Sequence, residues 1–273
     1  MFLAKPGEYP PCGMFNFKHL ILFIVTISGI IFATKRTKIK EKKDIKRIIQ
    51  IVTVIIWVLE ILKIIFDFAV GDGKNINKVV PLYYCSLLLY AGLLSSIGKG
   101  VIQRIGDVFL ATGGIIGGLV FLIMPTTSLP EYPMFHFISL HSFLYHGIMI
   151  YLGVIINKFK YIELKMSDIK YYSVLILIIC IGAYIINSKC GSNLMFISQD
   201  FPKNPITIIY HLTGKLFPIV MSLVQMTLPF LLVYGIVNIK NKYFHTNGLL
   251  KLKGEWIKYA NKWKMYFEQT RIK

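Results

Sequence analysis

The sequence predicts an all-α polytopic membrane protein with seven transmembrane helices. Of its 273 residues, 55% are hydrophobic, and the mean hydropathy is +0.61. The apolar residues are gathered in runs of about 17 to 25 residues, which is the length that spans a bilayer. Soluble domains contain fewer apolar residues and do not gather them in such runs. The net charge is +18. In a membrane protein, basic loops and anionic lipid headgroups explain such a charge, so we expect no nucleic-acid partner.

The predicted spans follow one another with short polar connections. In chain order they are 17–34, 48–70, 81–97, 105–124, 134–156, 171–187 and 206–237. Pro81 suits the start of the third span, because the N–H group that proline lacks would have no intrahelical partner in the first turn. Glycine pairs at 113–114 and 117–118 let a neighbouring helix approach the fourth span closely. Pro218 is expected to kink the seventh.

Charge predicts the orientation. The run 35–47 between the first two spans is dense in lysine and arginine, which places it in the cytoplasm. The N-terminus is then outside and the C-terminus inside, and most of the 31 lysine and arginine residues fall on the cytoplasmic side. We expect a multi-pass protein of a bacterial plasma membrane. No cleavable signal is expected, because the first eleven residues are polar and include three prolines.

Residues 238–273 form a second predicted domain after the seven-helix domain of residues 1–237. Apolar side chains recur there at spacings of three and four, with lysines in most of the gaps. They are Leu249, Leu252, Trp256, Ala260, Trp263 and Phe267. This pattern predicts a basic amphipathic helix that lies on the anionic lipids of the inner leaflet.

Cys85 has two interpretations. It falls about one turn inside the predicted third helix, near the positive end of the helix dipole, where a thiolate nucleophile is favoured. It is equally the kind of residue that fills a core, because free cysteines are often buried. Cys12 and Cys190 both fall outside under this topology, where they could pair. The four cysteines show no CxxC spacing. We expect no metal and no cofactor.

Ionisable residues inside a membrane are costly, so their positions are informative. Spacings of three and four put Glu60, Lys63 and Asp67 on one face of the second span. A rise of 1.5 Å per residue places them at the same depth as Cys85 and several histidines. We therefore expect one polar cavity open to the outer leaflet. The candidate substrate-binding residues are Glu60, Lys63, Asp67, Tyr83, His136, Asn193 and Lys215.

The fifth span carries three histidines at intervals of five residues. Such an interval turns a helix by about 140°, so His141 should point away from both His136 and His146. At least one of the three is therefore expected to be a packing residue.

Three motifs make the chain resemble a known family. They are Pro-Leu-x-x-Cys-Ser at 81–86, Tyr-Pro and His-Gly at 132–133 and 146–147, and Gly-Ser-Asn-Leu-Met-Phe with Phe-Pro at 191–196 and 201–202. Over residues 19–237 the chain resembles the YwaF-like integral membrane family of bacteria, which is related to eukaryotic transmembrane acyltransferases of ether phospholipids. The resemblance implies a membrane-embedded transferase with Cys85 as nucleophile and His146 as its histidine. Relatives tend to carry a histidine where this chain has Tyr83.

The first functional hypothesis is acyl transfer between phospholipids or lysophospholipids through a thioester on Cys85. A histidine would take the thiol proton and then activate the acceptor hydroxyl. The resemblance favours His146, whereas depth favours His211 or His141, so the sequence leaves all three open. Backbone N–H groups at the start of the third span, together with Asn193, would hold the oxyanion.

The alternative is a transporter or binding protein without covalent chemistry. Glu60, Lys63, Asp67 and the histidines would then bind an ion or a small anionic solute. The absence of an evident repeat pair argues against transport. A metal site of His136, His146, His211 and a carboxylate is a third hypothesis, with no HExxH or similar spacing to support it.

Overall fold

The structure is a computed structural model that describes residues 1–202 and 204–245, and the statements below refer to these residues. Every regular element among them is helical. Six stretches are long and apolar enough to cross a membrane. They are Phe17–Arg36, Lys42–Ala69, Gly100–Ile123, Phe137–Lys158, Met166–Cys190 and Ile206–Ile239. These stretches correspond to six of the seven predicted spans, so the described chain is a multi-pass helical membrane protein.

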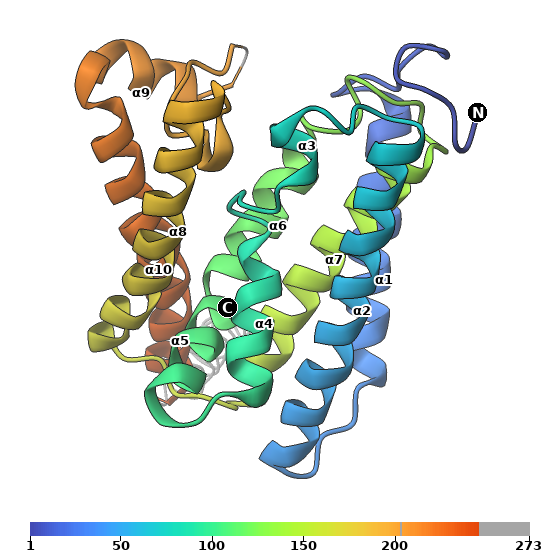
Figure 1. Cartoon of the computed structure of the whole chain (residues 1–273). Coiled ribbons are helices and arrows are strands. Elements are labelled where there is room, and N and C mark those ends of the chain that lie inside the picture. Colours follow the sequence, from blue (N-terminus) through green and yellow to red (C-terminus); the bar gives the residue numbers. More distant parts are fainter. Residues whose placement is uncertain (203, 246–273) are drawn as a thin grey trace, which may run out of the picture. The chain divides into compact units, whose positions relative to one another are not determined.

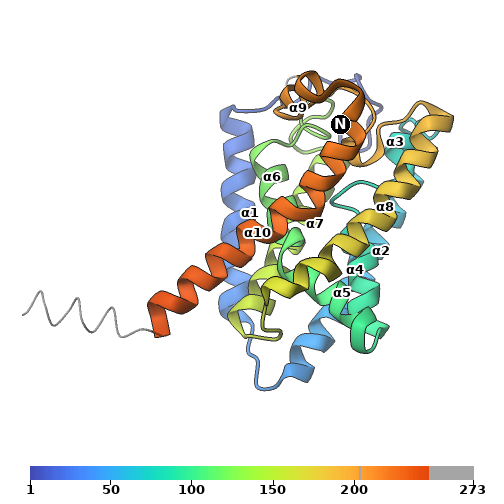
Figure 2. The same cartoon turned by 90° about the vertical axis from the view of Figure 1, so that its left-hand side faces the viewer.

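The long apolar stretches alternate in direction along the first 233 residues, with α5 and α6 continuing each other within one stretch (Figures 1 and 2). The longer ones are α1 (Phe17–Arg36), α2 (Lys42–Ala69), α4 (Leu87–Ile97), α5 (Gly100–Ala111), α6 (Gly113–Ile123), α7 (Phe137–Lys158), α8 (Ile169–Cys190), α9 (Ile206–Thr213) and α10 (Phe217–His245). Short pieces connect them: α3 (Ile76–Val79) and the 3₁₀ helices η1 (Met166–Asp168), η2 (Leu194–Phe196) and η3 (Gly214–Leu216). The helix α4 packs against α2 and α5, while α7 packs against α1, α2 and α6.

The predicted third span is where the structure differs most from the sequence-based expectation. Residues 81–86 are not helical, and α4 contains only 11 residues. Such a helix is about 16 Å long, roughly half of the 30 Å hydrocarbon core. The prediction of a helix from Pro81 was wrong because other elements satisfy the backbone there. The hydroxyl of Tyr90 donates to the carbonyl of Pro81, and that of Tyr145 to the carbonyl of Cys85.

The predicted seventh span is interrupted before Pro218, not at it. The predicted seventh span is divided into α9 and α10 by η3, where Gly214 has a φ of 51°. Pro218 lies in the first turn of α10, so the break precedes it. The packing interpretation of the glycine pairs is confirmed, because a Cβ on Gly118 would come 2.8 Å from the carbonyl oxygen of His146 on α7.

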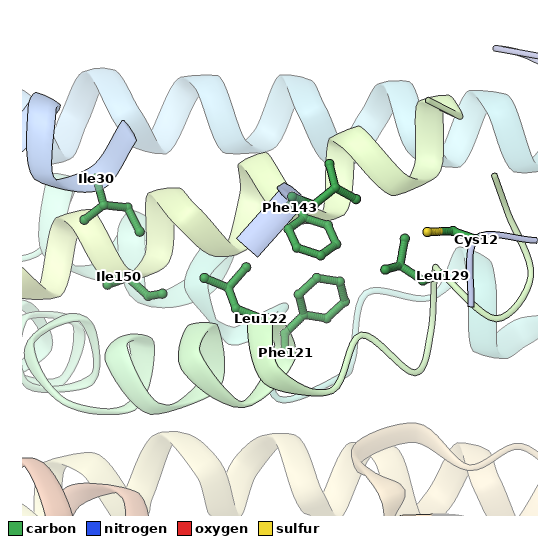
Figure 3. Packing of buried hydrophobic residues seen from close by; sticks show 8 residues of the cluster. Cys12, Ile30, Phe121, Leu122, Leu129, Phe143 and Ile150 are labelled. Atoms are coloured by element: carbon green, nitrogen blue, oxygen red, sulfur yellow. The ribbon is translucent and has the colours of Figure 1, made fainter. Parts of the chain in front are cut away.

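An apolar cluster joins α1, α6 and α7 (Figure 3). Phe121 of α6 and Phe143 of α7 meet edge to face, with ring centroids 5.6 Å apart. Cys12 packs in this cluster near Leu129 and is a free thiol, as are Cys85, Cys180 and Cys190. Burial raises the pKa of Cys12, although Lys18 opposes the effect, so this thiol is an apolar packing group.

The chain divides into two compact units, Met1–Val233 and Tyr234–Lys273. Of the second unit the structure describes residues 234–245, which are helical. The basic amphipathic helix predicted around Leu249, Trp256 and Phe267 lies outside the described residues.

Candidate functional site

Cys85 lies in a turn directly before α4, not inside the helix as predicted. Its side chain is partly buried. The backbone N–H groups of Cys85 and Ser86 and the charges of Glu60 and Lys63 are the groups whose electrostatics act on the thiol. Helix starts leave backbone N–H groups unpaired, so this position gives the sulfur nearby donors without placing it in the helix.

The expected oxyanion donors at the start of this helix are already in use. The N–H groups of Leu87, Leu88 and Leu89 donate to the carbonyls of Tyr84, Cys85 and Ser86 at 3.3, 3.1 and 3.0 Å. Each bond closes a 3₁₀-type turn, which is a common way to satisfy a helix end. This leaves the N–H groups of residues 85 and 86 as the candidate oxyanion donors.

Glu60 and Lys63 of α2 form an ion pair within the apolar part of the chain. Nζ of Lys63 lies 3.1 Å from Oε1 of Glu60, and the side chain of Glu60 is only 5% exposed. The charge of Glu60 acts on several polar side chains of neighbouring elements. They are Cys85 before α4, Tyr90 of α4, and His141 and Tyr145 of α7. Asp67, two turns further along α2, is also buried.

His141 contacts α2 at the residue before Glu60. Its Nε2 donates to the carbonyl of Leu59 at 3.1 Å. Since a carbonyl can only accept, Nδ1 carries the lone pair of the neutral ring. This Nδ1 is buried and has no hydrogen-bond partner among the described residues. The ring stacks on Tyr145, four residues later on the same face, with centroids 5.9 Å apart. His141 is thus a neutral imidazole with an unused acceptor.

His146 faces α6 instead. Its ring lies flat on Phe121, with centroids 3.7 Å apart, and Nδ1 donates to the carbonyl of Ser142 at 2.7 Å. The two histidines therefore lie on different faces of α7, as the 140° turn predicted. His146 is also neutral and has its lone pair on Nε2, but its contacts are those of a packing residue.

His136 caps α7 and does not line the site. Its Nδ1 accepts from the N–H of Ile138, and its Nε2 donates to the carbonyl of Ala4, both at 3.1 Å. The ring stacks on Tyr132 with centroids 4.4 Å apart and is completely buried. Burial lowers the pKa of His136. Both nitrogens are in use, so the residue has a structural role.

Three other candidates have contacts with residues other than Cys85. His211 is exposed on α9 and lies 3.7 Å from Asp200, and Lys215 is exposed in η3. The side chain of Asn193 accepts from the N–H groups of Ser198 and Gln199 and so holds its own loop. Within the described residues, no three His, Cys, Asp or Glu side chains are grouped to hold a metal ion, which contradicts the metal-site hypothesis.

Tyr83 connects two loops. Its hydroxyl donates to Oδ1 of Asn77 at 3.1 Å, and the same oxygen accepts from the N–H of Asn193 at 2.8 Å. Its ring lies 4.9 Å from that of Phe196. Tyr83 therefore holds the loop after α8 against the segment that leads to Cys85.

Sequence reasoning missed four aromatic residues around Cys85: Trp57, Tyr84, Tyr90 and Tyr145. Helical spacing could have identified two of them, because Trp57 precedes Glu60 by three residues and Tyr145 follows His141 by four. Tyr84 could not be found in this way. Its hydroxyl lies 2.6 Å from that of Tyr172 on α8, a contact between residues far apart in the sequence.

Comparison with known proteins places the chain in one family. Residues 14–246 match the model of the TMEM164 family, which covers most of the chain and all of the elements that surround Cys85. No curated protein and no solved structure matched the chain. The chain belongs to the TMEM164 family, a family of transmembrane proteins.

Proposed function

We propose that this protein is a membrane-embedded acyltransferase that moves a fatty acyl chain between lipids through a thioester on Cys85. The observation that carries the proposal is that Tyr145 contacts both Cys85 and His141. Its hydroxyl donates to the carbonyl of Cys85 at 3.5 Å, and its ring stacks on that of His141, whose buried Nδ1 has no partner among the described residues. A thiol with a neutral imidazole nearby is the usual pairing for nucleophilic catalysis by cysteine.

The proposed topology brings lipids to this site. Seven crossings with the N-terminus outside place Cys85 in the outer half of the bilayer of a bacterial plasma membrane. The third crossing consists of 81–86 and α4. Residues 81–85 are half-buried and Ser86 is buried, and non-helical backbone is tolerated in a membrane where protein covers it. Phospholipids or lysophospholipids then reach the thiol from the outer leaflet. The basic tail would bind anionic lipids of the inner leaflet.

The proposed reaction has two steps. Nδ1 of His141 takes the thiol proton, and the sulfur attacks the ester carbonyl of the donor lipid. The N–H groups of Cys85 and Ser86 hold the oxyanion. When the C–O bond breaks, the proton on His141 passes to the leaving lysolipid alkoxide. In the second step the hydroxyl of the acceptor gives its proton to His141 and attacks the thioester, which releases the sulfur.

The transport alternative has weaker support. Glu60 and Lys63 lie 3.1 Å apart and neutralise each other, so the pair offers little net charge to an ion or a small anionic solute. Buried partners of this kind are often structural. Full activity of a Cys85→Ser protein together with changed solute uptake would favour transport.

The test is acyl transfer in vesicles that contain the purified full-length protein, a phospholipid with a labelled acyl chain, and a lysophospholipid. Cys85→Ala should lower the rate at least about 10³-fold, because the covalent step is lost. Cys190→Ala is the matched control, since this thiol is free and exposed at the end of α8, and it should stay within about twofold. Equal transfer by wild type and Cys85→Ala would contradict the proposal.

A further inference from the structure

A group of polar side chains lies between α2, α4 and α7, beside Cys85. We call it the α2–α7 cluster, and it consists of Trp57, Glu60, Lys63, Tyr90, His141 and Tyr145. His141 of α7 donates to the carbonyl of Leu59, the residue before Glu60 in α2, at 3.1 Å, and its ring stacks on Tyr145 with centroids 5.9 Å apart. Trp57 lies one helical turn before Glu60, and its ring meets that of Tyr90 edge to face with centroids 6.3 Å apart. Three elements thus contribute to one polar region.

Two atoms of this cluster are buried without a hydrogen-bond partner in the described part of the chain. They are Nε1 of Trp57, which can only donate, and Nδ1 of His141, which carries a lone pair and accepts. The side chain of His141 is more than nine-tenths buried. Buried polar atoms are nearly always paired in proteins, and each unpaired one is costly. An unused donor and an unused acceptor in one cluster therefore indicate a bound group that can both accept and donate.

The charges of the cluster restrict what this group can be. Lys63 is already paired with Glu60 at 3.1 Å, so it offers no uncompensated cation to a phosphate. The carboxylate of Glu60 also repels an anion at this depth. An alcohol fits instead, because its oxygen accepts one hydrogen bond and its O–H donates another without adding charge.

We propose that the α2–α7 cluster is the acceptor subsite, which binds the free hydroxyl of a lysophospholipid between Nε1 of Trp57 and Nδ1 of His141. This inference rests on the proposed acyl transfer. The indole N–H donates to the hydroxyl oxygen, and the O–H donates to His141. When that oxygen attacks the thioester, the O–H proton passes to Nδ1, a C–O bond forms, the C–S bond breaks, and the proton then returns to the sulfur. Trp57 thus positions the acceptor and does not react.

The experiment measures binding without catalysis. Native mass spectrometry of the full-length Cys85→Ser protein would compare a lysophospholipid that has its free hydroxyl with the deoxy analogue, in which hydrogen replaces that hydroxyl. The hydroxyl lipid should bind at least about tenfold more tightly, as expected for one or two buried hydrogen bonds. Equal binding of the two lipids would overturn the inference.

Two further variants in the same Cys85→Ser background locate the subsite. Trp57→Phe keeps an aromatic ring against Tyr90 but removes the N–H, and it should reduce the preference for the hydroxyl lipid to about twofold or less. The control is Glu131→Gln in the loop before α7, which should keep the full preference. If Trp57→Phe keeps the preference for the hydroxyl lipid, the hydroxyl binds elsewhere. The same conclusion follows if Glu131→Gln removes the preference.

The outcome is separable from that of the proposed function. A thioester on wild-type Cys85 with equal binding of the two lipids would support acyl transfer and contradict the subsite. A hydroxyl preference that depends on Trp57, without any thioester, would support an alcohol-binding subsite and contradict acyl transfer.

Discussion

Two polar groups of the first unit differ in how completely their hydrogen bonds are satisfied. Arg104 of α5 makes a bidentate contact with Asp168, through Nε at 3.1 Å and NH2 at 2.5 Å, and also donates to the carbonyl of Glu163 at 2.7 Å. Asp168 in turn accepts from the N–H of Lys165 at 2.8 Å. We call this the Arg104–Asp168 pair. None of its side-chain atoms is among the buried atoms that lack a partner.

The α2–α7 cluster also contains an ion pair, but two of its buried atoms have no partner. The comparison teaches that a buried charge alone does not identify a site. The Arg104–Asp168 pair, whose hydrogen bonds are all made, has a structural role, because it joins α5 to the segment before α8. The unused donor and acceptor of the α2–α7 cluster have no such structural role, and a bound ligand would account for them.

The largest expected effect separates the two histidines of α7. His141→Ala should lower acyl transfer by about 10²–10⁴-fold, because it removes the proton acceptor. His146→Ala should affect the rate per folded molecule much less, because its contacts are the ring of Phe121 and its own helix. Transfer rates and the fraction of folded protein should be measured together. A large loss in His146→Ala with a normal rate in His141→Ala would assign the base to His146.

Removal of one partner from the satisfied pair should affect stability and leave the chemistry intact. Arg104→Ala leaves Asp168 without its guanidinium, while the carboxylate side chain is only 5% exposed. We expect a loss of about 2–4 kcal/mol in unfolding free energy, somewhat below that of a fully buried pair because Arg104 is partly exposed. Thermal unfolding in detergent would measure it. An unchanged melting temperature with reduced transfer would reverse the roles assigned to the two groups.

Tyr84 connects the turn of Cys85 to α6 and α8, and a glycine makes this contact possible. A Cβ on Gly113 would lie 2.8 Å from the hydroxyl of Tyr84 and 2.8 Å from a ring carbon of Tyr172. Gly113→Ala should therefore cost about 1–3 kcal/mol through overpacking. The neighbouring Gly114→Ala meets its nearest atom at 3.5 Å and should be close to neutral. Equal melting temperatures for the two variants would show that this contact is not tight.

The smallest effect is expected from the partly exposed ion pair of Lys78 in α3 and Glu131 in the loop before α7, which lie 2.7 Å apart. Partial burial lowers the pKa of Lys78, but the hydrogen bond and charge of Glu131 raise it by more, so that it lies above its ordinary value of 10.5. A raised pKa of a lysine stabilises the fold below the unfolded pKa, and this contribution is lost as the pH rises through the folded pKa.

Lys78→Gln should therefore destabilise by at most about 1 kcal/mol at pH 7. Its difference from wild type should shrink as the pH rises through the pKa of Lys78, which lies above the ordinary value of 10.5. Melting curves of both proteins over this pH range would test the prediction. A difference that grows at high pH would contradict it.

Much of the architecture follows from the sequence, because apolar length and charge determine where helices cross a membrane. Six spans, the shared face of Glu60, Lys63 and Asp67, and the divergence of His141 and His146 were all accessible through spacing. The start of α4 was not, because a proline that opens a helix and one that precedes it give the same pattern. The hydroxyls of Tyr90 and Tyr145 hydrogen-bond the carbonyls of residues 81 and 85 and so hold this segment outside the helix.

The sequence predicted the types of residue in the site, but not which of them contact one another. His136 was predicted to line the site, yet it caps α7 through contacts with Ile138 and with Ala4, which is 132 residues away in the sequence. Which histidine has an unused nitrogen depends on carbonyl groups of neighbouring helices, such as that of Leu59 for His141. Spacing along one helix contains no information about such partners.

Mass spectrometry of peptides from the wild-type protein, after brief incubation with a labelled phospholipid and no acceptor, tests the central claim most directly. The account predicts one labelled acyl group on Cys85, which hydroxylamine removes and which a lysophospholipid carries away. Unmodified Cys85, or a label on another residue in a protein that still transfers acyl chains, would contradict it.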